Sequence, residues 1–181
     1  MKKLQIILAV IGIFSLMSCE EMLNLGIEVE SNEVTVDFEV LPTDFIGDTT
    51  LATNVIQSDF NSAIEEAGLT LEDVESIKLK EAVVEITNED TTITFDFSEK
   101  VEATIEVDGL DEIVIASVDS IPEGARTLTC NVGDSELMDY VTAQEYIIRA
   151  KGKTVKAIEE NMNIRGSLTF SIKTNVDLET E

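Results

Sequence analysis

The chain has 181 residues, 44% hydrophobic and 27% charged, a composition that fits one packed domain rather than a disordered or fibrous chain. Its 37 Asp and Glu against 12 Lys and Arg give a formal net charge of −25. This excess argues against a nucleic-acid partner, because binding phosphates requires clustered cations. The chain has no histidine, which excludes most histidine-dependent catalysis and most zinc sites.

The N-terminus has the first recognisable pattern. Lys2 and Lys3 precede a mainly apolar run over residues 4–17. A lasting transmembrane helix needs about 20 apolar residues, so this run is short for that purpose. Its length and its basic flank are typical of a signal peptide.

The sequence Leu16-Met17-Ser18-Cys19 follows this run and resembles the lipobox of bacterial lipoproteins. The resemblance implies cleavage before Cys19, a diacylglyceryl thioether on its sulfur and a further acyl chain such as palmitate on its amine. Two or three chains would anchor the protein stably. The predicted organisation is a signal peptide over 1–18, an anchor and short tether over 19–22 and one domain over 23–181. The alternatives are an ordinary cleaved signal and an uncleaved anchor.

Glu20 and Glu21 follow the cysteine directly. They resemble the acidic export signal that sorts some gram-negative lipoproteins to the outer face of the outer membrane. The resemblance implies an outer-membrane location, and leaves open whether the domain faces the cell surface or the periplasm.

Period-two alternation then predicts strands. Leu23, Leu25, Ile27 and Val29 form one run, and a second run extends over residues 34–40. Ser31-Asn32 is expected to be a turn between them, so that the two strands could pair with each other.

A short helix is predicted from Ser58, as its cap, to Ala67, with Gly68 as its stop. Thr70 and Asp73 resemble a capping box that opens a single turn. The alternation of the next strand slips between Leu79 and Ala82, which predicts a β-bulge near Lys80 and Glu81. The remaining predictions, in chain order, are a hairpin strand at Ile93, Phe95 and Phe97, strands over 101–107, 113–115 and 128–132, a helix over 134–141, and strands over 146–150 and 164–176.

About eight strands separated mostly by turns, with two short helices, predict an all-β fold, an antiparallel β-sandwich of the immunoglobulin-like kind. An open β-barrel is the alternative. The chain as a whole resembles gram-negative outer-membrane lipoproteins that carry such a sandwich on a lipid anchor. That resemblance is one of architecture and supplies no active site.

Three cations, Arg149, Lys151 and Lys153, alternate along one predicted strand and form a candidate binding patch for an acidic partner. The alternative is that they pair with acids on neighbouring strands or protect a sheet edge. Cys130 has no cysteine partner if Cys19 is lipidated, and alternation with Leu128 predicts a small buried apolar side chain.

Thr49, Thr91 and Ser120 each follow an aspartate at an expected turn and resemble acceptors of O-glycosylation in gram-negative envelopes. Acidic loops at 88–90 and 108–112 could offer oxygen ligands to calcium, but neither has a known loop spacing. Gly133-Asp134-Ser135 resembles an esterase motif that requires a histidine base, and this chain has none.

The sequence therefore predicts a non-catalytic, lipid-anchored envelope protein that needs no cofactor and no metal. Its sandwich would present loops or a sheet edge to another envelope protein or a glycan. The alternative is a structural accessory subunit of an outer-membrane transport or motility complex that docks by edge-strand addition.

Overall fold

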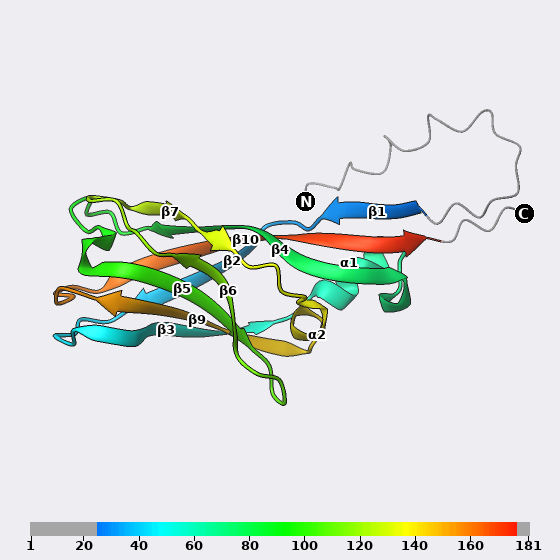
Figure 1. Ribbon diagram of the computed structural model, residues 1–181, viewed down its shortest axis with the longest axis horizontal. Coiled ribbons are helices and arrows are strands. Elements are labelled where there is room, and N and C mark those ends of the chain that lie inside the picture. Colours follow the sequence, from blue (N-terminus) through cyan, green and yellow to red (C-terminus); the bar gives the residue numbers. More distant parts are fainter. Residues whose placement is uncertain (1–24, 177–181) are drawn as a thin grey trace, which may run out of the picture.

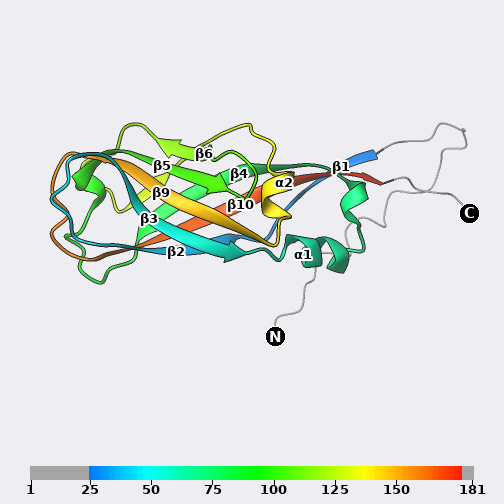
Figure 2. The same cartoon turned by 90° about the horizontal axis from the view of Figure 1, so that it is seen from below.

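The computed structural model describes residues 25–176, which form two antiparallel five-stranded sheets packed as a sandwich (Figures 1 and 2). The first sheet contains β1 (Leu25–Glu30), β2 (Val34–Val40), β4 (Val74–Ile86), β7 (Thr127–Thr129) and β10 (Met162–Val176). The second sheet has the order β3 (Gly47–Gln57), β9 (Glu145–Thr154), β5 (Ser98–Glu106), β6 (Ile113–Val118) and β8 (Asn131–Val132). The predicted all-β sandwich is confirmed, with ten strands rather than about eight.

The long strand β10 organises the first sheet. β4 pairs with one of its edges from Ile164 to Thr174, and β2 and β1 pair with the other edge, end to end. β1 and β2 therefore do not pair with each other, the arrangement that the sequence left open. Ser31 instead receives a hydrogen bond from the Phe170 N–H at 3.0 Å and donates its own N–H to the Phe170 carbonyl at 2.8 Å.

Two irregularities lie beside Phe170, one on each neighbour of β10. On one side, Glu30 pairs with Ser171 and Val34 with Leu168, so the link from Glu30 to Val34 has one residue more than the β10 segment opposite it. On the other side, the register shifts past Lys80, which confirms the predicted bulge. An added residue changes which alternate positions face the core, and this explains why the apolar alternation of the sequence slips at both places.

The core lies between the sheets, and its ends are closed differently. α1 (Phe60–Glu66) and α2 (Met138–Val141) cover one end, where the Phe60 ring meets Phe170 edge-on at 5.2 Å. The N-cap of α1 is Asp59 without a side-chain hydrogen bond, so the cap predicted at Ser58 is wrong. Gly68, just past the end of α1, has φ +77° as expected of the predicted stop, but Ala63 and Ala67 are exposed. α2 is shorter than predicted because residues 134–137 are not helical.

Single helical turns complete the fold. The turn η1 (Leu71–Asp73) has the predicted capping box, in which the Thr70 N–H donates to Asp73 at 2.7 Å. The turn η2 (Phe95–Phe97) replaces the strand predicted there. The hydroxyl of its cap, Thr94, accepts a hydrogen bond from the Asp96 N–H. Both phenylalanines are buried and close the core at the end opposite the helices.

β3 is the strand that the sequence analysis missed. Its eleven residues include the sequence Asp48-Thr49-Thr50, which was expected to be a turn. β3 is an edge strand whose alternate side chains are only half-buried, so threonine and asparagine are tolerated facing inward and the hydropathy pattern is weak.

Candidate functional site

The predicted patch of three cations lies on the outer face of β9, and each cation faces a carboxylate. Arg149 contacts Glu106 and lies 3.2 Å from Glu112. Lys151 lies 2.7 Å from Glu112, and Lys153 contacts Glu99. The three residues are thus brought together as expected, within a ladder of ion pairs that crosses from β9 to β5 and to the start of β6.

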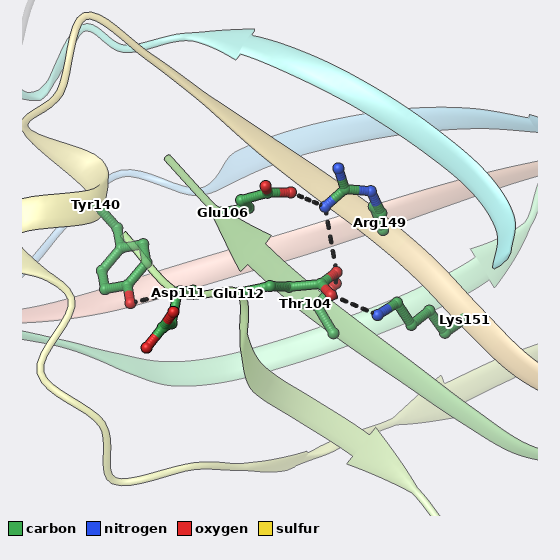
Figure 3. Close-up of polar contacts among 7 residues, drawn as sticks. All are labelled: Thr104, Glu106, Asp111, Glu112, Tyr140, Arg149 and Lys151. Carbon is green, nitrogen blue, oxygen red and sulfur yellow. Dashed lines mark hydrogen bonds and ion pairs between the residues drawn. The ribbon is translucent and has the colours of Figure 1, made fainter. Parts of the chain in front are cut away.

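Glu112 is the centre of this ladder (Figure 3). Its carboxylate accepts a hydrogen bond from Lys151 at 2.7 Å and another from the hydroxyl of Thr104, a buried residue, at 2.6 Å. The Lys151 hydrogen bond, followed by that of Thr104, lowers the pKa of Glu112 to about 2. The carboxylate is therefore ionised at neutral pH and holds the base of the β5–β6 hairpin against β9.

The tip of this hairpin is held from the other side by α2. The Tyr140 hydroxyl donates to the Asp111 carbonyl at 2.8 Å (Figure 3), and the Leu110 N–H donates to the Val107 carbonyl at 3.0 Å. Gly109 at the turn has φ +85°, a conformation that favours glycine. The hairpin therefore presents Leu110, 38% exposed, on a fixed backbone that projects from the body of the sandwich (Figure 1).

An open polar cleft lies at the end of the sandwich opposite the helices, where β5 begins and β9 ends. Both carboxylates and lysines line it, and Lys153 of the patch is one of them. Its lining residues are Asp96, Ser98, Glu99, Lys100, Asp119, Ser120, Ile121, Glu123, Lys153 and Lys156. This mixture of charges suits a polar ligand that carries both hydrogen-bond donors and acceptors.

Arg126, which lies between β6 and β7, holds the loop between β4 and η2, and no local pattern in the sequence indicates this role. Its guanidinium donates to four backbone carbonyls at distances from 2.5 to 3.0 Å, those of Ile86, Asn88, Asp90 and Ile93. These carbonyls come from one of the two acidic loops that the sequence offered for calcium. They are already engaged by a cation of the chain itself.

The second acidic loop is engaged in the same way, because the oxygens of Glu112 face Lys151, Arg149 and Thr104. Within residues 25–176, no group of three acidic or cysteine side chains is arranged to hold a metal ion. Asp134 of the esterase-like sequence lies 2.6 Å from Lys78 on the surface.

The three candidate glycosylation residues lie in different settings. Thr91 is exposed in a turn, and Ser120 is exposed at a bend on the rim of the polar cleft. Thr49 is half-buried within β3, paired with Gly152, so its expected location in a turn is wrong. An extended, paired backbone is less accessible to a modifying enzyme than a turn.

Cys130 lies between β7 and β8, where the chain passes from one sheet to the other. The predicted continuous strand over 128–132 is therefore wrong, because Leu128 is buried in the first sheet and Val132 is exposed in the second. Cys130 is a partly buried free thiol that packs against the core, and burial raises its pKa. The lipidation residue Cys19 and the export residues Glu20 and Glu21 lie outside the described residues.

The fold and these surfaces define an acid-rich, mainly β protein of two antiparallel sheets. A comparison with protein-family models and with curated proteins finds no match for the chain. Among the residues that the structure describes, no helix is both long enough and apolar enough to cross a membrane.

Proposed function

We propose that the protein is a non-catalytic, lipid-anchored protein of the cell envelope whose sandwich binds a protein or a glycan. The observation that carries the proposal is the sequence Leu16-Met17-Ser18-Cys19 directly after a signal-like apolar run. Glu20 and Glu21 favour the outer membrane as the location. The surface charge agrees with an exported domain that stays soluble and is repelled by anionic headgroups.

The arrangement of the ends supports a binding role. β1 begins at Leu25, only six residues after Cys19, and it lies at the end of β10 that the helices cover. The loops and the polar cleft lie at the other end of β10, about 45 Å away at roughly 3.3 Å per residue. A domain anchored at Cys19 would therefore present the cleft away from the membrane surface.

The absence of a catalytic role is supported by the residue types around the cleft. The chain has no histidine to act as a base for a serine, and the serines of the cleft lie among lysines and carboxylates. The buried hydroxyl of Ser98 donates to the Lys100 carbonyl at 2.6 Å, which occupies its proton in a structural hydrogen bond.

Metabolic labelling with an alkyne fatty acid tests the anchor. The full-length chain and the Cys130→Ala variant should both incorporate the label and partition with the outer membrane. Cys19→Ala should lose both properties, because it removes the acceptor sulfur. Unlabelled wild-type protein, or equal labelling of Cys19→Ala, would refute the anchor.

Photo-crosslinking in intact cells tests the binding role. A crosslinker at Ser120, on the cleft, is compared with one at Val55, an exposed position on β3. Recovery of an external protein or glycan from Ser120 alone supports the proposal. One recurrent membrane protein captured instead would favour the alternative, an accessory subunit of an outer-membrane complex.

A further inference from the structure

The two strands that share one edge of β10 are protected differently on their outer sides. β2 lies against β3, and the Asp37 carbonyl of β2 accepts a hydrogen bond from the Asn54 side chain of β3 at 2.8 Å. β1 pairs with β10, and no other strand within residues 25–176 pairs with it. β1 also contains neither lysine nor proline, the residues that commonly block an edge, and Val29 is 42% exposed.

The sequence of β1 is complementary to itself in one register. When two copies pair antiparallel around Ile27, Ile27 stands opposite Ile27 of the second copy, Leu25 opposite Val29, and Gly26 opposite Glu28. Apolar positions then face apolar positions, Glu28 faces Gly26, and Glu30 lies beyond the paired residues of β1.

The two other registers that pair five or more residues of β1 are unfavourable. A register centred on Glu28 places the two Glu28 carboxylates opposite each other, and like charges in that position are destabilising. A register centred between Ile27 and Glu28 places apolar positions opposite glutamates. The charges of β1 therefore select the Ile27-centred register.

The glutamates of β1 are also engaged within their own sheet. Glu28 accepts a hydrogen bond from the Ser171 hydroxyl at 2.5 Å, and Glu30 forms an ion pair with Lys80. Ser171 lies on β10 and Lys80 on β4, so both partners are on the side of β1 away from its open edge. These contacts draw the carboxylates away from the edge that a second copy would approach.

We propose that β1 is a homodimerisation edge, where a second copy of this chain adds antiparallel in the Ile27-centred register and joins the first sheets of both copies. The inference does not depend on the lipid or on the proposed binding role. The strong negative charge of each copy opposes the contact, and salt screens this repulsion. Dimerisation should therefore strengthen between low and physiological ionic strength.

Disulfide trapping of the full chain tests the register. In a Cys130→Ala background, Ile27→Cys should give a covalent dimer under mild oxidation, because the two positions meet on the symmetry axis. Glu28→Cys should give little, since its partner position is Gly26, and the Cys130→Ala parent controls for Cys19. Equal trapping from both positions, or none from Ile27→Cys, would overturn the register and the proposal.

Sedimentation velocity tests the edge without a new cysteine. Val29→Lys should raise the dimer dissociation constant by at least about tenfold, because it adds a charge to the edge. Val55→Lys, at an exposed position on β3, should leave the constant unchanged. A wild-type chain that stays monomeric, a dimer indifferent to Val29→Lys, or a different protein at this edge would each refute the second copy as its occupant.

Discussion

The two halves of β10 have the same alternation of residues but different surroundings. From Met162 to Leu168 the strand lies between β2 and β4 and beneath the second sheet. From Phe170 onward it lies between β1 and β4, and short helices replace the second sheet as the cover. We call the first part, together with β2 and the second sheet that covers it, the sandwich half. The second part, together with β1 and the helices, is the helix-covered half.

The second sheet and the helices bury the strands beneath them to different extents. A sheet of five strands covers β2 completely, so Val36, Phe38 and Val40 are buried. Two short helices cover Phe170 and Ile77 but leave Val29 exposed on β1. The helix-covered half therefore has a buried centre and an open edge at β1, whereas in the sandwich half the corresponding edge at β2 lies against β3.

The largest expected effect comes from removing one fully buried isoleucine in each half. Ile105→Ala in β5 should lower the free energy of unfolding by about 4 kcal/mol, because two sheets cannot close the cavity. Ile77→Ala in β4 should cost about 2 to 3 kcal/mol, since short helices can move to fill the space. Urea denaturation measures both, and equal losses would contradict a difference in packing between the halves.

Arg126 stabilises only the sandwich half, because its four carbonyl contacts all hold one loop there. Arg126→Lys keeps the charge, but an ammonium group cannot reach four carbonyls, so we expect a loss of about 2 to 3 kcal/mol. Hydrogen exchange should accelerate at residues 86–93 and stay unchanged in β1. Uniform acceleration across both halves would show that the loop is not the site of the effect.

Glu112 in the sandwich half should contribute more than the exposed ion pair of Glu75 and Lys173 in the helix-covered half. Glu112→Gln should cost about 1 to 2 kcal/mol at pH 7, and Glu75→Gln less than about 0.5 kcal/mol. Because the folded pKa of Glu112, about 2, lies below its ordinary value of 4.5, its contribution is complete above pH 4.5.

That contribution is lost as the pH falls from 4.5 through 2, so the difference between wild type and Glu112→Gln should narrow over this range. Urea titrations at pH 7 and pH 3 measure it. A difference that stays constant with pH would mean that the carboxylate charge of Glu112 is not what stabilises the hairpin.

The smallest expected effect is a gain in stability. Gly166 lies in β10 in the sandwich half, and a methyl group there would meet the Val36 carbonyl at 3.7 Å and the Phe38 ring at 3.8 Å, which are ordinary contacts. Gly166→Ala should therefore raise the melting temperature by a few degrees, about 0.5 to 1 kcal/mol, because the unfolded chain loses freedom.

Gly152→Ala in β9 is the matched control, since its methyl group would lie 2.8 Å from Leu51 and 3.2 Å from the Lys100 carbonyl. It should lower the melting temperature. A gain at Gly152, or a loss at Gly166, would show that the packing around these glycines differs from the one described.

The strands that the sequence predicted correctly are those with one buried face. β2 and the first half of β10 alternate because every second side chain enters the core, and β5 follows the pattern except that Thr104 is buried beside Ile105. β3 escaped prediction because an edge strand tolerates threonine and asparagine facing inward. η2 was predicted as a strand because Phe95 and Phe97 alternate, and nothing local shows that a turn buries both.

The candidate cation patch was predictable as a row, because three basic residues alternate on one strand. Its pairing with carboxylates was not predictable. Glu99 and Glu106 lie on β5 and Glu112 lies just before β6, and both strands are distant from β9 in the sequence. Arg126 could not be found for the same reason, because its partners are backbone carbonyls that carry no residue identity.

Local sequence was enough to predict the period-two pattern, the bulge at Lys80, the glycine stop of the first helix, the capping box of η1 and the acidic surface. These properties depend on neighbouring residues, whose spacing sets which face is apolar. That β1 and β2 share one edge of β10, and that no other strand within residues 25–176 pairs with β1, follows from long-range packing instead. Strand pairing joins residues as far apart as Leu25 and Val176, and local propensity carries no information on which edges meet.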